Sequence, residues 1–339
     1  MKGRIDEIRE RRTLDDEGLG TLLDTQDPAL VEALHEQARE VAQERFGKNV
    51  YIRALIEWSN VCRNDCLYCG IRKSNPTVHR YTLTREEILS ACEKAWTEGL
   101  RTFVLQGGEN PRSALELAGT VAEIRDSWPE AAITMSLGEL PFGTYKLLKE
   151  SGADRYLLRH ETASPAHYAR LHPASMRLET RLQCLLELKE LGFQTGMGMM
   201  VGSPFQTTED LIKDIRLIER IQPEMVGIGP FIPAKDTPFA NQPAGSADKT
   251  LRLYSLLRLM FPRMLIPATT ALSSLLPDGR SRGILAGANV IMPSYTPDSR
   301  RADYALYAGK RHEQLGTIEQ ELSAIGYGIS RSRGDYSEN

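Results

Sequence analysis

The sequence predicts an α/β fold, and three observations lead to that prediction. From Tyr51 onward, short apolar runs alternate with amphipathic stretches of helical period, which is typical of βα units around a parallel sheet. The apolar runs number close to eight. The chain has 339 residues, a length that single α/β barrels commonly reach. We therefore expect a complete (β/α)8 TIM barrel with an N-terminal helical extension and a short C-terminal tail.

The chain is expected to form one domain with additions at both ends. Residues 1–48 are rich in charge and lack β-branched runs, which predicts helices packed outside the barrel. Residues 49–329 are expected to form the barrel. Arg, Ser, Gly and Asp dominate residues 330–339, which predicts a tail. No repeat or Pro-rich linker divides the chain.

Strands and helices are expected to alternate through the barrel. The strands are predicted at 54–57, 102–106, 133–137, 155–158, 194–201, 225–228, 265–269 and 290–292. The helices between them include 85–96, 112–125, 142–149, 176–191 and 208–221. Thr84 and Glu87 have the spacing of a capping box, and acidic residues after Thr207 suit a first helical turn.

Cys62, Cys66 and Cys69 form a CxxxCxxC motif that uses three of the five cysteines in the chain. Thiolates are the ligands that iron-sulfur clusters use, and three so close in sequence can bind one face of a 4Fe-4S cluster. Three ligands for four irons leave one iron open. An open iron can bind a small molecule, so the motif predicts a chemically active cluster.

Other interpretations of the cysteines are a structural zinc site or a disulfide framework. Zinc needs a fourth ligand, and the nearest candidate is His79. Disulfides are disfavoured because the cysteine count is odd and the N-terminus has no apolar leader, which together predict a reducing, cytoplasmic compartment. Cys92 and Cys184 lie in helical patterns and are expected to be small buried apolar residues.

The composition limits the classes of partner. A formal net charge of -3 gives no electrostatic footprint for nucleic acid. No apolar run approaches the length of a membrane span. The expected partner is a small molecule or another protein, with no nucleic acid and no membrane.

Polar and glycine-rich groups follow the predicted strands one after another. They stand at 106–109, 136–139, 159–162, 200–202, 229–230, 269–270 and 293–295. In a barrel of this type, chemistry occurs at the C-terminal ends of the strands, so these groups should converge on one mouth. The cysteine loop leaves the first strand at the same end.

Several segments now carry a family resemblance. The CxxxCxxC loop after a first strand and the Gly-Gly-Glu at 107–109 resemble the radical S-adenosylmethionine (SAM) superfamily. Within it, segments 57–62, 154–162, 225–233 and 288–293 resemble the HydE-type maturases, which help to assemble the active-site cluster of FeFe-hydrogenase. The likeness runs from about Tyr51 to Lys310.

The resemblance implies a set of SAM contacts. Tyr68 is expected beside the adenine, Glu161 toward the ribose hydroxyls, and Arg181 at the carboxylate, which its planar fork suits. Without side chains, Gly107 and Gly108 would let the backbone approach the ammonium group. The full implied set is Tyr68, Gln106, Gly107, Gly108, Glu109, Ser136, Glu161, Arg181 and Met292. The structural alternatives are loop packing for Tyr68, a plain turn at the glycines, a solvated helix face for Arg181 and core packing for Met292.

The resemblance also implies a substrate cavity inside the barrel. Its polar wall would consist of Thr134, Arg159, Thr269 and Thr270, closed from the C-terminal side by Tyr304 and Tyr307. A buried Arg needs an anionic partner, so Arg159 is expected to anchor a carboxylate. A structural ion pair with Glu161 or Asp154 is the alternative. His160 and His172 have no second His at ligand spacing, and neither is assigned a role.

The implied reaction is reductive. An electron enters the cluster from a reducing donor, and the carbon-sulfur bond of the SAM sulfonium is cleaved. The resulting 5′-deoxyadenosyl radical acts on a cysteine-bound iron carbonyl cyanide precursor. The resemblance also implies other hydrogenase maturation proteins as partners. The chain has no cysteine after Cys184, so no second C-terminal cluster is expected. Gly107 stands where the family commonly has Ser, a change that bears on substrate choice.

Alternatives to the maturase interpretation remain open. A methylornithine-synthase-like mutase and a biotin-synthase-like synthase share the barrel and the motif. A non-enzymatic scaffold that carries an iron complex is the third. Release of 5′-deoxyadenosine separates the enzymes from the scaffold.

Overall fold

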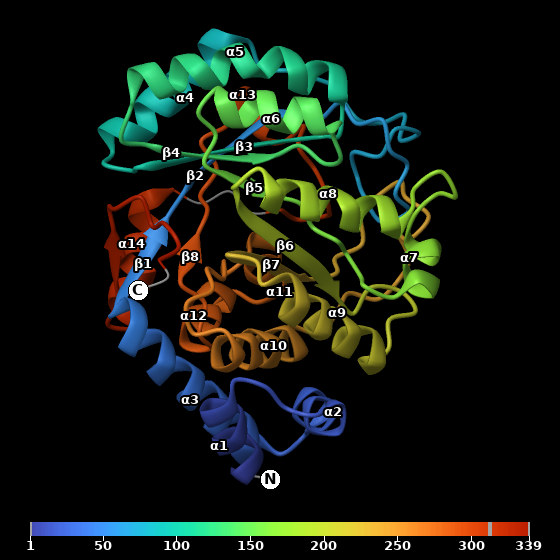
Figure 1. Cartoon of the computed structure of the whole chain (residues 1–339), viewed down its shortest axis with the longest axis vertical. Coiled ribbons are helices and arrows are strands. Elements are labelled where there is room, and N and C mark those ends of the chain that lie inside the picture. The colour runs from blue at the N-terminus through green and yellow to red at the C-terminus, as the bar shows by residue number, and fades with distance from the viewer. Residues whose placement is uncertain (1, 311–313, 338–339) are drawn as a thin grey trace.

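The centre of the molecule is a parallel sheet of six strands, in a computed structural model that describes residues 2–310 and 314–337 (Figure 1). The strands are neighbours in chain order and all pairs are parallel. They are β2 (Ala54–Ser59), β3 (Thr102–Gly107), β4 (Ala132–Ser136), β5 (Arg155–Leu157), β6 (Gln194–Val201) and β7 (Met225–Pro230). Their positions confirm the first six predicted strands.

Single bridges continue the barrel between β7 and β2. Leu265 bridges Met225, and Pro267 bridges Val290 of the short β8 (Val290–Ile291). Leu55 then bridges Ser294, with backbone hydrogen bonds on both sides of the bridge. The predicted strand at 265–269 is therefore in place but forms no regular ladder. Pro267 explains part of this, because proline has no N–H to donate to a neighbouring strand.

Side chains alternate between the core and the barrel interior. On β3, Phe103 and Leu105 join the main hydrophobic core, while Gln106 faces a cavity. On β4, Ile133 and Met135 join the same core, while Ser136 faces the cavity. A period of two residues along each strand accounts for this division.

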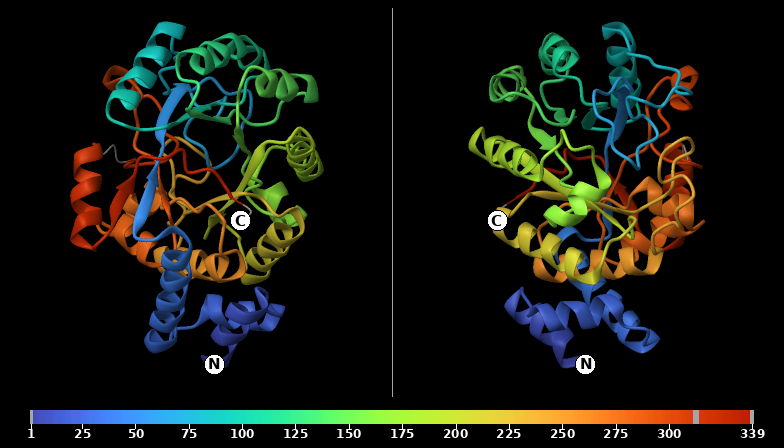
Figure 2. Two further views of the ribbon diagram at one scale, coloured as in Figure 1. Left: turned by 60° about the vertical axis from the view of Figure 1, so that its left-hand side comes forward. Right: turned by 90° about the vertical axis from the view of Figure 1, so that its right-hand side faces the viewer.

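Helices surround the sheet on its outside (Figure 2). They are α4 (Arg85–Thr97), α5 (Pro111–Ser127), α6 (Phe142–Glu150), α7 (Pro165–Leu171), α8 (Leu178–Glu190), α9 (Thr208–Ile221), α10 (Ala247–Met260), α11 (Thr270–Leu275), α12 (Gly279–Leu285), α13 (Asp298–Arg301) and α14 (Leu315–Ala324). The five predicted helices agree with α4, α5, α6, α8 and α9 to within two residues at each end. Capping boxes begin α4 at Thr84 and α9 at Thr207.

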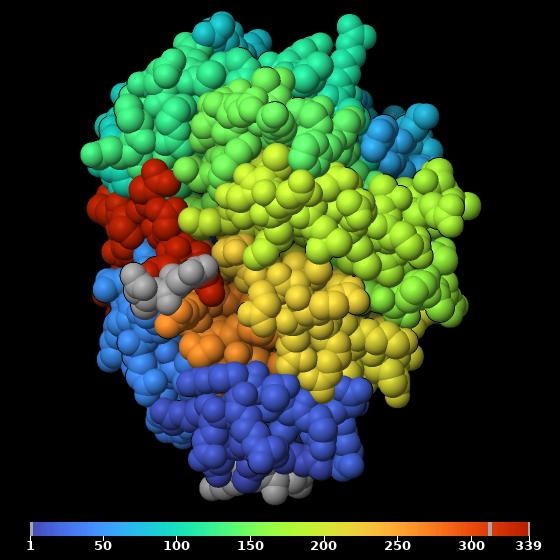
Figure 3. Space-filling view, in the orientation of Figure 1, coloured from blue at the N-terminus to red at the C-terminus, as the bar shows by residue number. Residues whose placement is uncertain are grey.

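The N-terminal residues form three helices, α1 (Lys2–Arg11), α2 (Asp16–Asp24) and α3 (Pro28–Phe46). They form a layer beside the barrel, at the bottom of Figures 1 and 3. Asp27 caps α3, and Pro28 occupies its first turn, where a missing N–H costs nothing. The buried face of α3 packs against α10.

The C-terminal segment lies against the end of the barrel where the strands begin. β1 (Asn49–Ile52) pairs in parallel with β8 and with β9 (Gly328–Ser330). Beyond β9, Asp335 forms an ion pair with Arg155, the first residue of β5, at 2.6 Å. The carbonyl of Arg333 accepts from the Thr102 hydroxyl at the start of β3. No helix within the described residues is both long enough and apolar enough to span a bilayer.

Candidate functional site

A cavity of about 310 Å³ lies where the strands end. Its wall includes the cysteine loop, the ends of several strands and the segment around Tyr304. Every residue predicted to contact the cluster, the cofactor or the substrate lines it, with the exception of Thr134. These lining residues are Cys62, Cys66, Tyr68, Cys69, Gln106, Gly107, Gly108, Glu109, Ser136, Arg159, Glu161, Arg181, Thr269, Thr270, Met292, Tyr304 and Tyr307.

Thr134 lies two residues before Ser136 on β4, deeper in the barrel. The residue is 2% exposed, and its hydroxyl has no hydrogen-bond partner. The alternation along β4 places it on the same face as Ser136. Thr134 is thus below the cavity wall, and its position there was not apparent from the strand prediction.

The cysteine loop is held by backbone contacts to several parts of the chain. Arg63 N–H donates to the carbonyl of Glu109, and Gly70 N–H to the carbonyl of Leu306. A Cβ at Gly70 would stand 2.0 Å from the carbonyl oxygen of Ala305. Only glycine fits there, because no real Cβ approaches backbone so closely.

The three thiols suit an iron-sulfur cluster. Burial raises the pKa of Cys62, Cys66 and Cys69, the last to about 12. Their thiolates therefore need nearby positive charge, which the irons of a cluster would supply. Each cysteine of a cluster binds a different iron. Among the described residues, no group of three His, Cys, Asp or Glu side chains is arranged to hold a single metal ion.

The remaining cysteine and zinc candidates lie elsewhere. His79 is an exposed side chain that contacts Asp303 at 3.1 Å. Cys92 and Cys184 are buried in α4 and α8, which confirms their prediction as small apolar residues.

Arg181 of α8 lies in a network of charges at the cavity wall. Its Nε is 2.7 Å from Glu139, and its Nη2 is 3.6 Å from Glu109. Arg63 of the cysteine loop contacts Glu109 at 2.8 Å. Burial alone lowers the pKa of Arg181, but Glu139 and Glu109 outweigh burial and raise it above the usual value. Arg181 is 9% exposed, so the alternative of a solvated helix face is wrong.

Arg159 and Glu161 follow β5 and face the cavity together. Their side chains form an ion pair at 3.1 Å, so the structural alternative for Arg159 is present, while Asp154 instead pairs with Arg125 and Arg333. The Nε of Arg159 is buried without a hydrogen-bond partner. Such an orphaned donor in a cavity wall suits a bound acceptor.

The backbone of Glu161 is in the left-handed region, with φ +66°. Its N–H donates to the carbonyl of Gly198 at 2.9 Å. The preceding His160 is fully buried, and its Nε2 lies 3.1 Å from Asp214 of α9. These contacts hold the strained residue, and with it the carboxylate, at the cavity.

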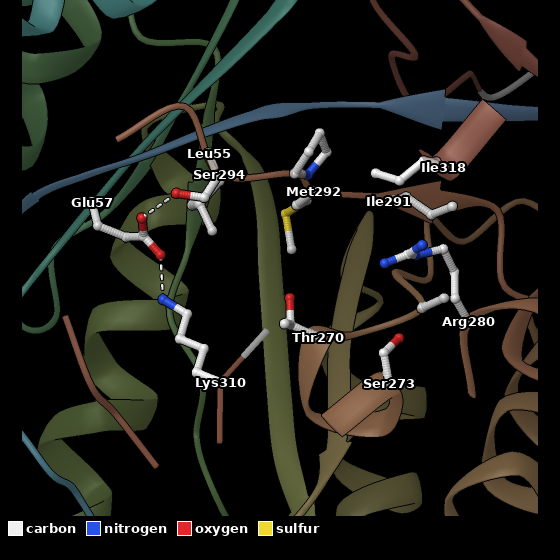
Figure 4. A pocket seen from close by; sticks show the side chains of 12 residues that line it. Leu55, Glu57, Thr270, Ser273, Arg280, Ile291, Met292, Ser294, Lys310 and Ile318 are labelled. Carbon is white, nitrogen blue, oxygen red and sulfur yellow. Dashed lines mark hydrogen bonds and ion pairs between the residues drawn. The ribbon is translucent and has the colours of Figure 1, made fainter. Parts of the chain in front are cut away.

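A second, water-sized chamber of about 20 Å³ adjoins the main cavity (Figure 4). Glu57 and Lys310 form a buried ion pair at one side, and Ser294 donates to Glu57 at 2.7 Å. Burial alone raises the pKa of Glu57, but Lys310 and the hydroxyls outweigh it and lower the pKa. Met292 and Thr270 lie between Glu57 and Arg280 and line both spaces.

Comparison with known proteins gives this geometry a family. The profile of the Radical SAM superfamily matches residues 56–218. A FeFe hydrogenase maturase subunit HydE from Thermotoga maritima is 47% identical over 312 residues, covering 91% of this chain and 89% of that protein. The chain belongs to the HydE family of radical SAM enzymes.

The same barrel occurs in a second branch of the superfamily. A 3-methylornithine synthase from Methanosarcina acetivorans is 28% identical and covers 95% of this chain and 92% of its own length. The crystal structure of methylornithine synthase (PylB) superimposes with a TM-score of 0.86 at 27% identity, over 96% of this chain and 97% of that one. This likeness supports the predicted TIM barrel.

Gly107 of the cavity wall packs against a buried tryptophan. A Cβ at Gly107 would stand 2.4 Å from Nε1 of Trp58, so the indole fills the space that a side chain would need. Trp58 is 4% exposed and belongs to the main core. The glycine is therefore matched to Trp58 across the β2–β3 pair.

The sequence prediction missed several residues of the site. Glu139 stands in a group noted at a strand end, but its partner Arg181 is distant in sequence. Lys310 carries no motif. His172 is one of the two histidines to which the sequence assigns no role, and in the structure its Nε2 lies 3.1 Å from the Tyr68 hydroxyl. Contacts between distant segments bring all three to the site, and periodicity does not reveal such contacts.

Proposed function

We propose that this chain is the radical SAM enzyme of FeFe-hydrogenase active-site (H-cluster) assembly. The observation that carries the proposal is the cavity that three cysteine thiols share with two arginines, two threonines and three tyrosines. The 47% identity to a HydE maturase over nearly the whole chain supports the choice of pathway.

In this proposal, Cys62, Cys66 and Cys69 hold a 4Fe-4S cluster with one open iron, and no second cluster is present. When bound, the cluster and SAM supply reductive carbon-sulfur cleavage to a 5′-deoxyadenosyl radical. The chain's own residues orient the reactants and exclude water from them.

The SAM contacts form one part of the cavity wall. Tyr68, Ser136 and Met292 flank the nucleoside, and the carboxylate of Glu161 accepts from ribose hydroxyls. The backbone at Gly107 and Gly108 receives the ammonium group, beside Gln106 and Glu109. Arg181 has five N–H donors, so it can bind a carboxylate while Glu139 remains its partner.

The substrate contacts adjoin the SAM contacts in the same cavity, where Arg159 is paired with Glu161 and Thr270 lies beside Met292 (Figure 4). Arg159, with its free Nε, binds the carboxylate of a small cysteine-bound iron carbonyl cyanide precursor. Thr269 and Thr270 donate hydroxyls, Thr134 lies below them, and Tyr304 and Tyr307 close the space. Partners would be this substrate, a reducing electron donor and other maturation proteins, in the cytoplasm.

The proposal is tested by anaerobic reconstitution with iron and sulfide, followed by electron paramagnetic resonance of the reduced protein. We expect a cluster signal that changes when SAM is added, and 5′-deoxyadenosine on turnover. Cys66→Ala should lose the cluster because, among the described residues, Cys62, Cys66 and Cys69 are the only cysteines that line the cavity, and no further thiol can replace Cys66. Cys92→Ala, at a buried cysteine of α4 that does not line the cavity, is the matched control and should bind the cluster as wild type does.

A cluster that does not respond to SAM would contradict the enzyme and favour the carrier scaffold. Equal losses in Cys66→Ala and Cys92→Ala would contradict the ligand assignment.

The second candidate is a mutase or synthase on the same barrel, favoured by the TM-score of 0.86 to methylornithine synthase. Incubation of the reconstituted protein with amino acids and SAM separates the two. Formation of 3-methylornithine would replace our proposal, whereas activation of an apo-hydrogenase in the presence of the other maturases would support it.

A further inference from the structure

The cysteine loop rests on the segment that follows α7. Leu67 N–H donates to the carbonyl of Leu171 at 2.9 Å. The hydroxyl of Tyr68 lies 3.1 Å from Nε2 of His172. The Sγ of Cys66 is 3.7 Å from the Sδ of Met176. Three consecutive residues of the loop are thus supported by one short stretch of chain.

The hydrogen bonds of His172 determine its tautomer. Nδ1 lies 3.0 Å from the carbonyl oxygen of Tyr168. A carbonyl oxygen only accepts, so Nδ1 carries the proton. In a neutral ring, Nε2 then accepts, and the Tyr68 hydroxyl must donate to it.

Packing fixes the ring of His172 on both sides. It stacks on Tyr168, with centroids 3.9 Å apart, and meets the edge of Tyr68 at 5.4 Å and 88°. The residue is 4% exposed. Burial lowers its pKa to about 3, so the ring stays neutral and remains an acceptor near neutral pH.

We propose that His172 is a positioning residue for the cysteine loop. Its Nε2 accepts a hydrogen bond from the Tyr68 hydroxyl, and this bond holds the loop in the conformation that binds SAM. This inference rests on the proposed function. It assigns different roles to the hydroxyl and the ring of Tyr68. The hydroxyl donates to His172 and lies beside the Cys66 thiol, while the ring, in the wall of the cavity, contacts the cofactor.

The test compares SAM binding to the reconstituted wild type, His172→Phe, Tyr68→Phe and the double variant. Phe keeps an aromatic ring beside Tyr168, but that ring is larger than imidazole and lacks both hydrogen bonds of the His172 nitrogens, so Tyr68→Phe is the variant that removes the Tyr68–His172 bond alone. Loss of the Tyr68–His172 hydrogen bond should weaken SAM binding about three- to tenfold in Tyr68→Phe and by at least as much in His172→Phe, with cluster content unchanged in both. The double variant should be no weaker than His172→Phe alone, because Tyr68→Phe removes no further bond to His172 once the imidazole is gone. Adding SAM should change the cluster's paramagnetic signal less in each of these variants than in wild type at the same SAM concentration.

His167→Phe is the matched control. His167 lies on α7, the helix that His172 follows, is 3% exposed and contacts Ser203 and the carbonyl of Pro204 instead of the cysteine loop. It should bind SAM as wild type does, even if its thermal stability falls.

Three results would overturn the inference: unchanged SAM affinity in His172→Phe, additive losses in the double variant, or an equal loss in His167→Phe. If His172→Phe does not fold, Tyr68→Phe decides alone, because wild-type affinity in that variant removes the role of the bond. Wild-type protein that binds no cluster would instead contradict the proposed function itself.

Discussion

At the scale of single residues, some polar atoms in and near the cavity wall lack a hydrogen-bond partner. Arg159 and Glu161 neutralise each other, yet the Nε of Arg159 has no hydrogen-bond partner. The hydroxyl of Thr134 is also unpaired. Buried donors without partners are uncommon in folded proteins, so the unpaired Nε in the cavity wall suits the proposed role of Arg159 as a ligand contact, whereas Thr134 lies below that wall.

Arg159→Ala should keep the cluster and SAM binding and weaken substrate binding about ten- to hundredfold, because it removes a charged anchor from a part-buried site. Arg159→Lys should lose less, since it keeps the charge beside Glu161 and loses only the planar fork. Binding of the iron carbonyl cyanide complex by calorimetry is the measurement. Arg177→Ala, on an exposed side chain, is the control. Unchanged affinity in Arg159→Ala would refute the anchor role.

At the scale of elements, the pairing of β2 with β3 explains Gly107. The register shifts between Glu57 and Ser59, and Ser59 pairs with Gly107. Trp58 stands within this irregularity and its indole occupies the place of a side chain at 107. The sequence linked Gly107 to a contact in the cavity. Packing against Trp58 in the core is a second reason for glycine at this position.

Gly107→Ser should destabilise the fold by about 1–3 kcal/mol, the usual cost of forcing atoms into a packed core. Trp58→Phe should also destabilise it, by leaving space. In the double variant the two losses should be less than additive, because the smaller ring makes room for the serine. Unfolding in denaturant measures all three. Gly119→Ser on α5, where nothing stands within 4 Å of the added Cβ, is the control. Strictly additive losses would show that the two residues are not matched.

At the scale of the whole molecule, the two ends of the barrel are closed by different means. The cysteine loop and the Tyr304 segment cover the end that holds the cavity. At the other end, the C-terminal segment places Asp335 against the fully buried Arg155. The ion pair ties the last described residues to the centre of the sheet.

Asp335→Asn should lower the free energy of unfolding by about 1 kcal/mol at pH 7, a modest value because the carboxylate is 36% exposed and partly screened. Burial alone raises the pKa of Asp335, but Arg333 and Arg155 outweigh burial and hold the pKa below its usual value. A lowered folded pKa means that the stabilisation is complete above the unfolded pKa and is lost as pH falls through the folded one. The difference between wild type and variant should thus persist at pH 5 and shrink below about pH 4.

Denaturant unfolding at several pH values checks this. Asp298→Asn, which removes an exposed ion pair with Arg301, should change little at any pH. A stability difference for Asp335→Asn that does not shrink in acid would contradict the role of its charge.

Local patterns in the sequence were sufficient for the barrel and for most of the cavity wall. Strand ends meet at one edge of a parallel barrel, so residues after successive strands could be placed together without a structure. This reasoning placed Gln106, Ser136 and Arg159 beside the cysteine loop. The capping residues and the buried Cys92 and Cys184 followed from equally local rules.

The sequence by itself determined the cysteine motif, the alternation of strands and helices and the set of polar strand ends. Each of these depends only on residues that are close to one another in the chain. Only the tertiary structure decided the partners of Arg181, the support of Tyr68 by His172, the match of Gly107 with Trp58 and the docking of Asp335 on Arg155. Each of these joins segments far apart in the chain, and such contacts form only when the barrel closes and brings those segments together.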